Sequence, residues 1–166
     1  MNKFIFISIA IASFGLLANL DNMIQIPNSE TLELPLPLPY ERTKVSKKAL
    51  NDFIANVDSN KQAIVIFGAN WCPDCRVLEG TLRIPTIKKF MTQNFEILHI
   101  DLGRYDINME LLEVLGIPKQ EGVPRVVIFD QNGSPLNLDT NDEWRTARDR
   151  KQQDIFNYFQ SFVNKS

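Results

Sequence analysis

Two cysteines, Cys72 and Cys75, are the residues of this chain whose type and spacing are best suited to chemistry. They flank Pro73 and Asp74 in the run WCPDC. Pro73 suits the first position of a helix, because its φ is fixed and its missing N–H would have no partner inside the helix. Cys72 would then lie at the helix N-terminus, where free N–H groups and the positive end of the helix dipole favour a thiolate. We therefore expect Cys72 to be a nucleophile and Cys75, one turn further along, to be its resolving thiol.

This arrangement would carry out thiol–disulfide exchange. The Cys72 thiolate would attack a disulfide to give a mixed disulfide, and Cys75 would then attack Cys72 and release the reduced product. Asp74 works against the helix terminus, because a nearby carboxylate disfavours a second negative charge. We therefore expect a less acidic Cys72, and a more reducing couple, than a neutral or basic residue at position 74 would give.

Two other uses of the cysteines need to be weighed. A zinc site normally takes four ligands, and this chain offers two Cys and the single His99, so a metal would need a second chain or several carboxylates. A structural disulfide across so short a loop would stabilise the fold little. Because the motif follows a buried-strand pattern and opens a helical one, redox chemistry is favoured and no metal is expected. The sequence has no Gly-rich dinucleotide fingerprint, so no cofactor is expected either.

The composition is that of one globular domain. The chain has 166 residues, 44% of them hydrophobic and 23% charged, which is too apolar for a mainly disordered protein. Its formal net charge is -2, so there is no cationic excess for phosphates and nucleic acid is not an expected partner. Two cysteines are also too few for the disulfide framework of a small secreted domain.

The N-terminal 42 residues divide into two segments. Residues 1–20 have the layout of a secretory signal, with Lys3 before an apolar run that is shorter than the roughly 20 residues needed to span a bilayer. A cleaved signal and an exported, periplasmic or secreted protein are expected, with an uncleaved membrane anchor as the alternative. Residues 21–42 are Pro-rich and favour an extended, polyproline-like path. We interpret them as a leader that is ordered only if it lies on the domain; the alternative is a recognition segment for another protein.

Apolar periodicity in the remaining domain, residues 43–166, predicts helices that alternate with buried strands. Helices are expected over 45–57, from Cys75 to a break at Pro85 and beyond it, over 111–115 and over 155–163, and strands over 63–67 and 95–101. Asn132 and Gly133 predict a hairpin between strands at 125–129 and 135–138. The charged stretch 142–151 is interpreted as a solvated loop or helix face. This order favours a parallel core with antiparallel strands added to one side.

On two of these segments the sequence resembles the thioredoxin family. The segments are IVIFGANWCPDC at 64–75 and EGVPRVVIFDQNG at 121–133, and the order of elements matches over 45–163. The chain also looks like a subgroup of exported bacterial thioredoxin-like proteins that carry FGANWCPDCR. The resemblance implies a thioredoxin-like α/β fold, with a central mixed sheet and helices on both faces, and a protein-disulfide oxidoreductase.

The resemblance also assigns roles to residues outside the cysteine pair. Val123 and Pro124 match the family's cis-proline site, where the proline faces the cysteines and the backbone of the preceding residue pairs with the substrate. Trp71 matches the aromatic residue that shields the nucleophile; simple core packing is the alternative. Arg125 follows the proline, where the family often has a small residue. Our hypothesis is that its charge selects acidic substrates or supports the Cys72 thiolate.

The chain departs from the family at an internal acid–base pair. Where thioredoxins have a buried acid and its lysine partner in two central strands, this chain has Ile66 and Ile97. The usual proton acceptor for the resolving cysteine is therefore missing, and Asp74 or water would have to replace it. His99, also in a strand, is interpreted as a satisfied strand histidine rather than a catalyst.

These observations predict an exported reductase of disulfides. Its expected partners are disulfide-containing proteins or small thiol substrates and a membrane-bound electron donor, since the chain has no cofactor motif of its own, and we expect a monomer. A disulfide-forming oxidase or isomerase is the alternative within the enzyme class, and the reduction potential distinguishes it. A non-catalytic thioredoxin-like binding or assembly module is the alternative outside that class.

Overall fold

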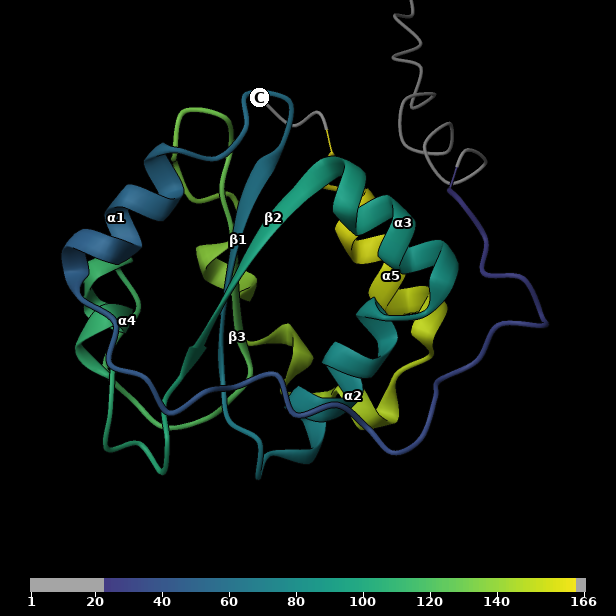
Figure 1. Cartoon of the computed structure of the whole chain (residues 1–166), viewed down its shortest axis with the longest axis horizontal. Helices are drawn as coiled ribbons and strands as arrows, with labels where there is room; N and C mark the ends of the chain where they lie inside the picture. The colour runs from purple at the N-terminus through teal and green to yellow at the C-terminus, as the bar shows by residue number, and fades with distance from the viewer. Residues whose placement is uncertain (1–22, 164–166) are drawn as a thin grey trace, which may run out of the picture.

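The structure, a computed structural model, describes residues 23–163, so the predicted signal segment 1–20 lies outside the described residues. The helices and strands follow the predicted order (Figure 1). They are α1 (Lys47–Ala55), β1 (Gln62–Gly68), α2 (Pro73–Leu82), α3 (Pro85–Asn94), β2 (Phe95–Asp101), α4 (Glu110–Val114), β3 (Arg125–Ile128), the 3-10 helices η1 (Leu138–Thr140) and η2 (Glu143–Asp149), and α5 (Gln152–Gln160). Within residues 23–163, no helix is both long enough and apolar enough to cross a membrane.

The three strands form a mixed sheet with β1 in the centre. β1 pairs with β2 in parallel over its whole length, from Gln62 opposite Phe95 to Gly68 opposite Asp101. On its other side, β1 pairs with β3 in antiparallel register. All seven residues of β1 are buried, as expected for a strand covered on both faces. Figure 1 shows α1 and α4 on one side of the sheet and α2, α3 and α5 on the other, so the predicted fold class is confirmed.

Proline positions set the helix boundaries around the cysteines. Pro73 is the first residue of α2, and the helix ends at Leu82. Pro85 begins α3, which confirms the predicted break in the helical pattern. A proline fits these positions because the first N–H groups of a helix have no intrahelical partner. The cysteines are therefore fixed to one short helix, directly after the central strand.

The predicted hairpin forms only in part. Its turn is present, because Asp130 N–H donates to Ser134 O at 2.8 Å and Gly133 has a φ of 78°. The prediction of a second strand over 135–138 is wrong, because an isolated bridge between Phe129 and Pro135 takes its place. The side chain of Asn137 takes the place of a pairing strand, since its Oδ1 accepts from Ile128 N–H at 2.8 Å. With this backbone group satisfied by a side chain, the chain turns into η1 instead of extending.

The charged stretch 142–151 is not a simple solvated surface. It contains η2, in which Trp144 and Ala147 are buried in the core. The η2 segment packs closely against α2, the helix that carries the cysteines. Most of its charged side chains are partly exposed, while one large and one small apolar residue, Trp144 and Ala147, secure it in the core. Two apolar positions are too few for periodicity to detect.

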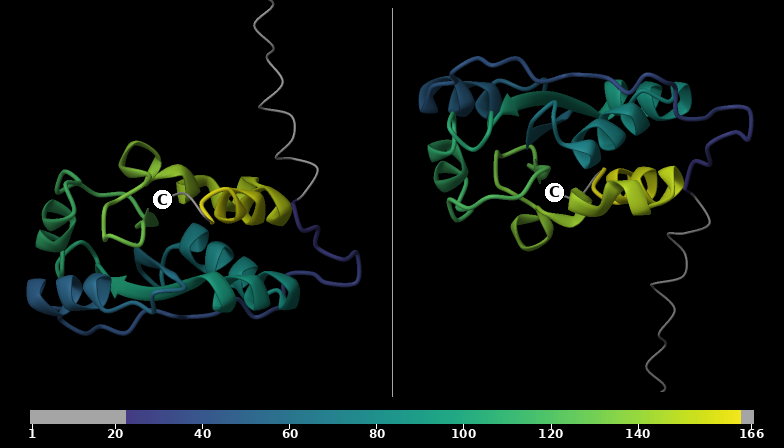
Figure 2. Two further views of the ribbon diagram at one scale, coloured as in Figure 1. Left: turned by 90° about the horizontal axis from the view of Figure 1, so that it is seen from above. Right: turned by 90° about the horizontal axis from the view of Figure 1, so that it is seen from below.

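The leader lies on the domain along its described length. Residues 23–42 pass α5 and α3, cross α2 and then lead to α1 (Figures 1 and 2). Near its start, Ile26 N–H donates to Gln153 Oε1 of α5 at 2.8 Å. Near its end, Tyr40 is only 5% exposed and forms part of the hydrophobic core. The leader is therefore an extended segment that contributes a core residue.

Candidate active site

Cys72 and Cys75 meet at the first turn of α2. Cys72 is the N-cap residue, and its Sγ accepts a hydrogen bond from Cys75 N–H at 3.2 Å. The Cys72 thiol in turn donates to Val123 O at 3.6 Å. Both cysteines are free thiols and both are buried. The predicted placement of the pair at a helix N-terminus is thus what the structure shows.

The two thiols have opposite acidities. A hydrogen bond from the side chain of Cys75 is the largest influence that lowers the pKa of Cys72, from 9.0 to about 7; burial opposes it, and the bond from Cys75 N–H contributes less. Burial is the largest influence on Cys75 and raises its pKa well above the ordinary value; its hydrogen bond to Cys72 acts in the same direction. Cys72 therefore carries the negative charge of the pair near neutral pH, while Cys75 keeps its proton.

Asp74 points away from solvent and is held by Arg148 of η2. Its side chain is largely buried, and its Oδ1 accepts from Arg148 N–H at 3.0 Å and from Arg148 Nε at 3.1 Å. The charge of Asp74 raises the pKa of Cys72, in the predicted direction, but this influence is weaker than the hydrogen bond from Cys75. Arg148 belongs to η2, so this contact also ties η2 to the start of α2.

Trp71 lies at the surface beside the thiols, with 42% of its side chain exposed. Its Nε1–H donates to Gly103 O at 2.6 Å, and its ring meets Tyr105 edge to face at a centroid distance of 5.6 Å. The guanidinium of Arg104 lies 5.7 Å from the ring centroid. Trp71 is thus a surface platform next to Cys72, whereas simple core packing would require a buried ring.

The turn before α2 and the loop before β3 form the two walls of the site. We call residues 69–72 the cysteine turn and residues 121–124 the proline loop. The Val123–Pro124 peptide bond is cis, and Val123 O is the group that accepts from the Cys72 thiol. The structure therefore brings together the two segments that the sequence singled out, more than forty residues apart along the chain.

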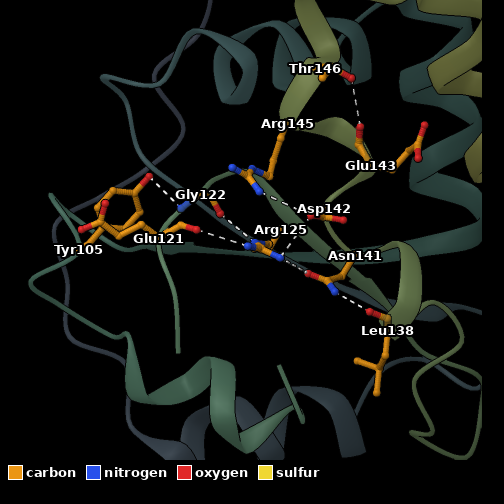
Figure 3. Close-up of polar contacts among 10 residues, drawn as sticks. All are labelled: Tyr105, Glu121, Gly122, Arg125, Leu138, Asn141, Asp142, Glu143, Arg145 and Thr146. Carbon is orange, nitrogen blue, oxygen red and sulfur yellow. Dashed lines mark hydrogen bonds and ion pairs between the residues drawn. The ribbon is translucent and has the colours of Figure 1, made fainter. Parts of the chain in front are cut away.

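Arg125 holds the proline loop from inside the protein. Its side chain is 3% exposed, and it donates from Nε to Gly122 O at 2.8 Å and from Nη2 to Glu121 O at 3.4 Å (Figure 3). Its Nη1 donates to Asn141 Oδ1 at 3.1 Å and lies 3.7 Å from Asp142 Oδ2. A guanidinium enclosed in this way has no surface to offer a substrate. The structure thus gives Arg125 a positioning role in place of the hypothesised selection of acidic substrates.

Comparison with known proteins decides the family. The family model described as thioredoxin-like matches residues 52–131. The solved structure of a disulphide isomerase from Xylella fastidiosa Temecula1 is 32% identical, covers 76% of this chain and 97% of its own, and superposes with a TM-score of 0.67. The chain belongs to the thioredoxin family. This membership supports a thiol–disulfide oxidoreductase in general terms.

Two further structures match over shorter or less similar stretches. Chloroplastic thioredoxin z is 30% identical over 53% of this chain and 69% of its own, with a TM-score of 0.40. The oxidised C-terminal domain of Neisseria meningitidis DsbD is 24% identical over 65% of this chain and 99% of its own, with a TM-score of 0.42. No curated protein matches the chain.

This thioredoxin-family protein has a hydrogen-bonded pair behind Cys75, Glu79 and His99, that the sequence interpretation missed. Glu79 is one helical turn beyond Cys75, and its Oε2 lies 2.8 Å from His99 Nε2. His99 is opposite Ile66 in the register of β1 and β2, so it stands beside the position where the family's buried acid is absent. His99 and Arg83 together lower the pKa of Glu79 against the effect of burial. The spacing of four residues between Cys75 and Glu79 is the signal that could have indicated this pair.

Tyr105 and Tyr40 are two more residues of the site that no local pattern indicated. Tyr105 Oη accepts from Gly122 N–H at 3.1 Å and so supports the proline loop from the side of Trp71. Tyr40 meets His99 edge to face at a centroid distance of 5.6 Å. Within residues 23–163, no three His, Cys, Asp or Glu side chains are grouped closely enough to hold a metal ion.

Proposed function

We propose that this protein is an exported thiol–disulfide reductase in which Cys72 attacks and Cys75 resolves. The Cys72 thiolate forms a bond to one sulfur of a substrate disulfide, and the other substrate sulfur leaves as a thiolate. Cys75 then loses its proton and bonds to Cys72, which releases the second substrate sulfur. Two electrons pass to the substrate, and the protein is left with a Cys72–Cys75 disulfide.

The observation that carries this proposal is the unequal acidity of the two thiols. Cys72, with its pKa lowered to about 7, is substantially ionised at neutral pH. A thiol with a pKa near the ambient pH is close to the optimum for attack, since a stronger acid would give a poorer nucleophile. Cys75 is protonated and enclosed, so it attacks only after Cys72 has bonded to the substrate.

The proline loop supports a role in binding an extended substrate chain. Val123 O accepts a hydrogen bond from the Cys72 thiol, so it lies beside the sulfur to which a substrate would bond. Trp71 offers an exposed apolar ring on the other side of the cysteine turn. Together they form a short edge for backbone pairing and a hydrophobic contact, which suits disulfide-containing proteins as substrates.

Regeneration needs an external donor of two electrons. Export is supported by the signal-like layout of residues 1–20 and by the bacterial disulphide isomerase among the relatives. Outside the cytoplasm, a membrane-bound donor with its own dithiol is the class of partner that can return the Cys72–Cys75 disulfide to two thiols. In that exchange, the donor becomes oxidised as this protein is reduced.

Disulfide isomerisation is the second candidate, because a relative that covers 76% of this chain is described as a disulphide isomerase. An isomerase uses the same attack by Cys72 but returns the substrate with a different pairing and no net transfer of electrons. The two functions need different potentials. A reductase requires a dithiol that gives up its electrons readily, whereas an isomerase requires a more oxidising couple.

The deciding experiment is the equilibrium reduction potential of the Cys72–Cys75 couple in a defined thiol buffer. A potential near that of thioredoxin, about −270 mV, is expected for a reductase. A value near about −180 mV, as in protein disulfide isomerase, would contradict the reductase and favour isomerisation. In parallel, Cys75→Ser is expected to accumulate a mixed disulfide with an oxidised substrate, and Cys72→Ser to form none.

A further inference from the structure

The leader contacts the cysteine turn directly, and we propose that it is a working part of the redox site. We call residues 30–40 the strap. The strap fixes the cysteine turn through Asn70 and Tyr40, and it fixes helix α2 through Arg76, so that releasing it changes the redox equilibrium of the cysteines. This inference rests on the proposed function and assigns a positioning role to a segment that composition alone presents as a linker.

Asn70 joins the strap to the cysteine turn by two hydrogen bonds. Its Oδ1 accepts from Tyr40 N–H at 3.1 Å, and its Nδ2 donates to Tyr40 O at 2.7 Å. The turn itself is closed by Cys72 N–H, which donates to Ala69 O at 3.1 Å. Asn70 is two residues before Cys72, so the strap is bonded to the centre of the turn that presents the nucleophile.

The side chain of Tyr40 fills the space beneath the turn. Its hydroxyl lies against Gly68, so close that a Cβ at this position would be 2.2 Å from Tyr40 Oη. Only glycine leaves room for the phenol here. Burial raises the pKa of Tyr40 well above its ordinary value, and negative charge on Cys75, Glu79 or Cys72, where present, raises it further. The phenol is therefore neutral, and it lies within electrostatic range of both thiols.

Arg76 joins the strap to the first turn of α2. Its Nη2 donates to Leu36 O at 2.9 Å and its Nε to Pro37 O at 3.4 Å. Leu36 also packs on Gly80, where a Cβ would be 3.0 Å from its Cδ2. These carbonyls are free to accept, because an extended Pro-rich segment makes no internal hydrogen bonds.

The far end of the strap is fixed to the next helix. Glu30 accepts from Thr86 N–H at 2.8 Å and from Thr86 Oγ1 at 2.9 Å, at the beginning of α3. The strap thus spans the helix that carries both cysteines and is secured on each side of it. The contact between Glu30 and Thr86 only attaches the strap to the domain, because it lies far from the thiols. The contact between Tyr40 and Asn70 reaches the cysteine turn itself.

Loss of these contacts should weaken the stabilisation of the Cys72 thiolate. That stabilisation comes first from the side chain of Cys75 and, to a smaller extent, from Cys75 N–H, so both contributions depend on the position of Cys72 at the N-cap. If the strap is released, the cysteine turn loses its fixed position and the reduced form loses stability relative to the disulfide. By reciprocity, the redox state of the cysteines must also change how firmly the strap is bound.

The test compares three variants of the full chain in a dithiothreitol redox buffer. Asn70→Ala removes both bonds to the strap, and Tyr40→Ala removes the buried ring. Leu38→Ala is the matched control, because this strap residue is 63% exposed. We expect the first two variants to shift the dithiol–disulfide equilibrium about tenfold toward the disulfide, which is about 30 mV for a two-electron couple. The control should stay within about twofold.

Hydrogen exchange provides a measurement that a purely structural strap would not affect. Amides of the strap should exchange at different rates in the reduced and oxidised wild-type protein. Folded variants with an unchanged equilibrium, together with equal strap protection in both redox states, would overturn the inference. Failure of the proposed function looks different: the wild-type protein itself would then show no exchange with a disulfide, or an oxidising potential.

Discussion

The two walls of the site are fixed by different means. The cysteine turn is held by uncharged groups, namely the Asn70 amide and the backbone of Tyr40, on a segment about thirty residues earlier in the chain. The proline loop has one hydrogen bond to Tyr105, but its two carbonyl contacts come from a buried charge, the Arg125 guanidinium, which follows it directly. One wall thus depends on long-range neutral contacts, and the other depends mainly on local hydrogen bonds from a charged group.

This difference matters for how each wall can fail. A buried guanidinium is costly to desolvate, and it stays in place because it satisfies several acceptors at once. Its removal would leave the carbonyls of Glu121 and Gly122 without their donor. The neutral contacts at Asn70 each stabilise less, but they can be released together with the strap. The proline loop should therefore be the more rigid wall and the cysteine turn the more adjustable one.

The largest effect is expected from breaking the charged wall with Arg125→Met. Methionine fills much of the volume but leaves two carbonyls and Asn141 unsatisfied, so we expect a loss of about 3 kcal/mol in the free energy of unfolding. Urea unfolding measures it. Arg145→Met is the control, since Arg145 is 45% exposed and pairs with Asp142 at the surface, and it should cost less than about 1 kcal/mol. Equal losses in the two variants would contradict the role of the buried charge.

The second prediction concerns pH. Neither the Asn70 contact of the cysteine turn nor the Arg125 contact of the proline loop contains a group that titrates near neutral pH. The Arg125 guanidinium stays protonated even though burial lowers its pKa, and an amide does not titrate. The pH dependence of thiol reactivity between pH 6 and 9 should therefore come from Cys72, whose pKa falls from 9.0 to about 7 on folding. The rate of alkylation of Cys72 should rise about tenfold per pH unit below its midpoint near 7.

The same shift has a consequence for the stability of the reduced protein. Below pH 7, Cys72 is protonated in both the folded and the unfolded state and contributes nothing. Between pH 7 and 9, the folded state releases the proton first, so the stability of the reduced form should rise relative to the oxidised form. Above pH 9, the raised pKa of Cys75 acts in the opposite sense and should lower it. A flat difference between the two redox forms from pH 6 to 9 would contradict the assignment of Cys72 as the acidic thiol.

Gly68→Ala is the third prediction and tests the neutral wall. The new Cβ would meet Tyr40 Oη at 2.2 Å, so the buried phenol or the end of β1 must move. Overpacking of this kind costs about 1–3 kcal/mol, measured by urea unfolding. Gly80→Ala is the matched control, because its Cβ would meet only the ends of the flexible Leu32 and Leu36 side chains. If Gly68→Ala is no more destabilising than the control, Tyr40 is not firmly seated.

Features governed by local rules could be predicted from the sequence. Pro73 and Pro85 indicated two helix starts because the geometry of proline acts on its own residue and its neighbour. The buried run of β1 was readable because every one of its positions is apolar or small except Gln62. The hairpin at Asn132 and Gly133 shows the limit of such rules. Its turn follows from local φ preferences. Its second strand does not form, because the Asn137 side chain accepts from Ile128 N–H in place of a strand backbone.

Features that depend on partners far along the chain were not predictable from one sequence. Arg125 was interpreted by its charge, and nothing local shows that Asn141 and Asp142 enclose it. The strap was interpreted by its prolines, and its docking depends on Asn70, thirty residues after Tyr40. The proposed chemistry was therefore inferred from WCPDC and its local setting, whereas the groups that position the cysteines became visible only in three dimensions.

The smallest effect is expected at Asp74, which both belongs to the cysteine motif and faces η2. Asp74→Asn keeps an oxygen that can accept from Arg148 N–H, but it removes a charge that raises the pKa of Cys72. The pKa of Cys72 should fall slightly, and the couple should become more oxidising by about threefold in its equilibrium constant, or about 15 mV. Asp154→Asn in α5 is the control and should leave the equilibrium unchanged. Because the cysteine turn is the adjustable wall, a shift at Asp74 larger than that in Asn70→Ala would mean that the local charge, and not the strap, sets the redox equilibrium.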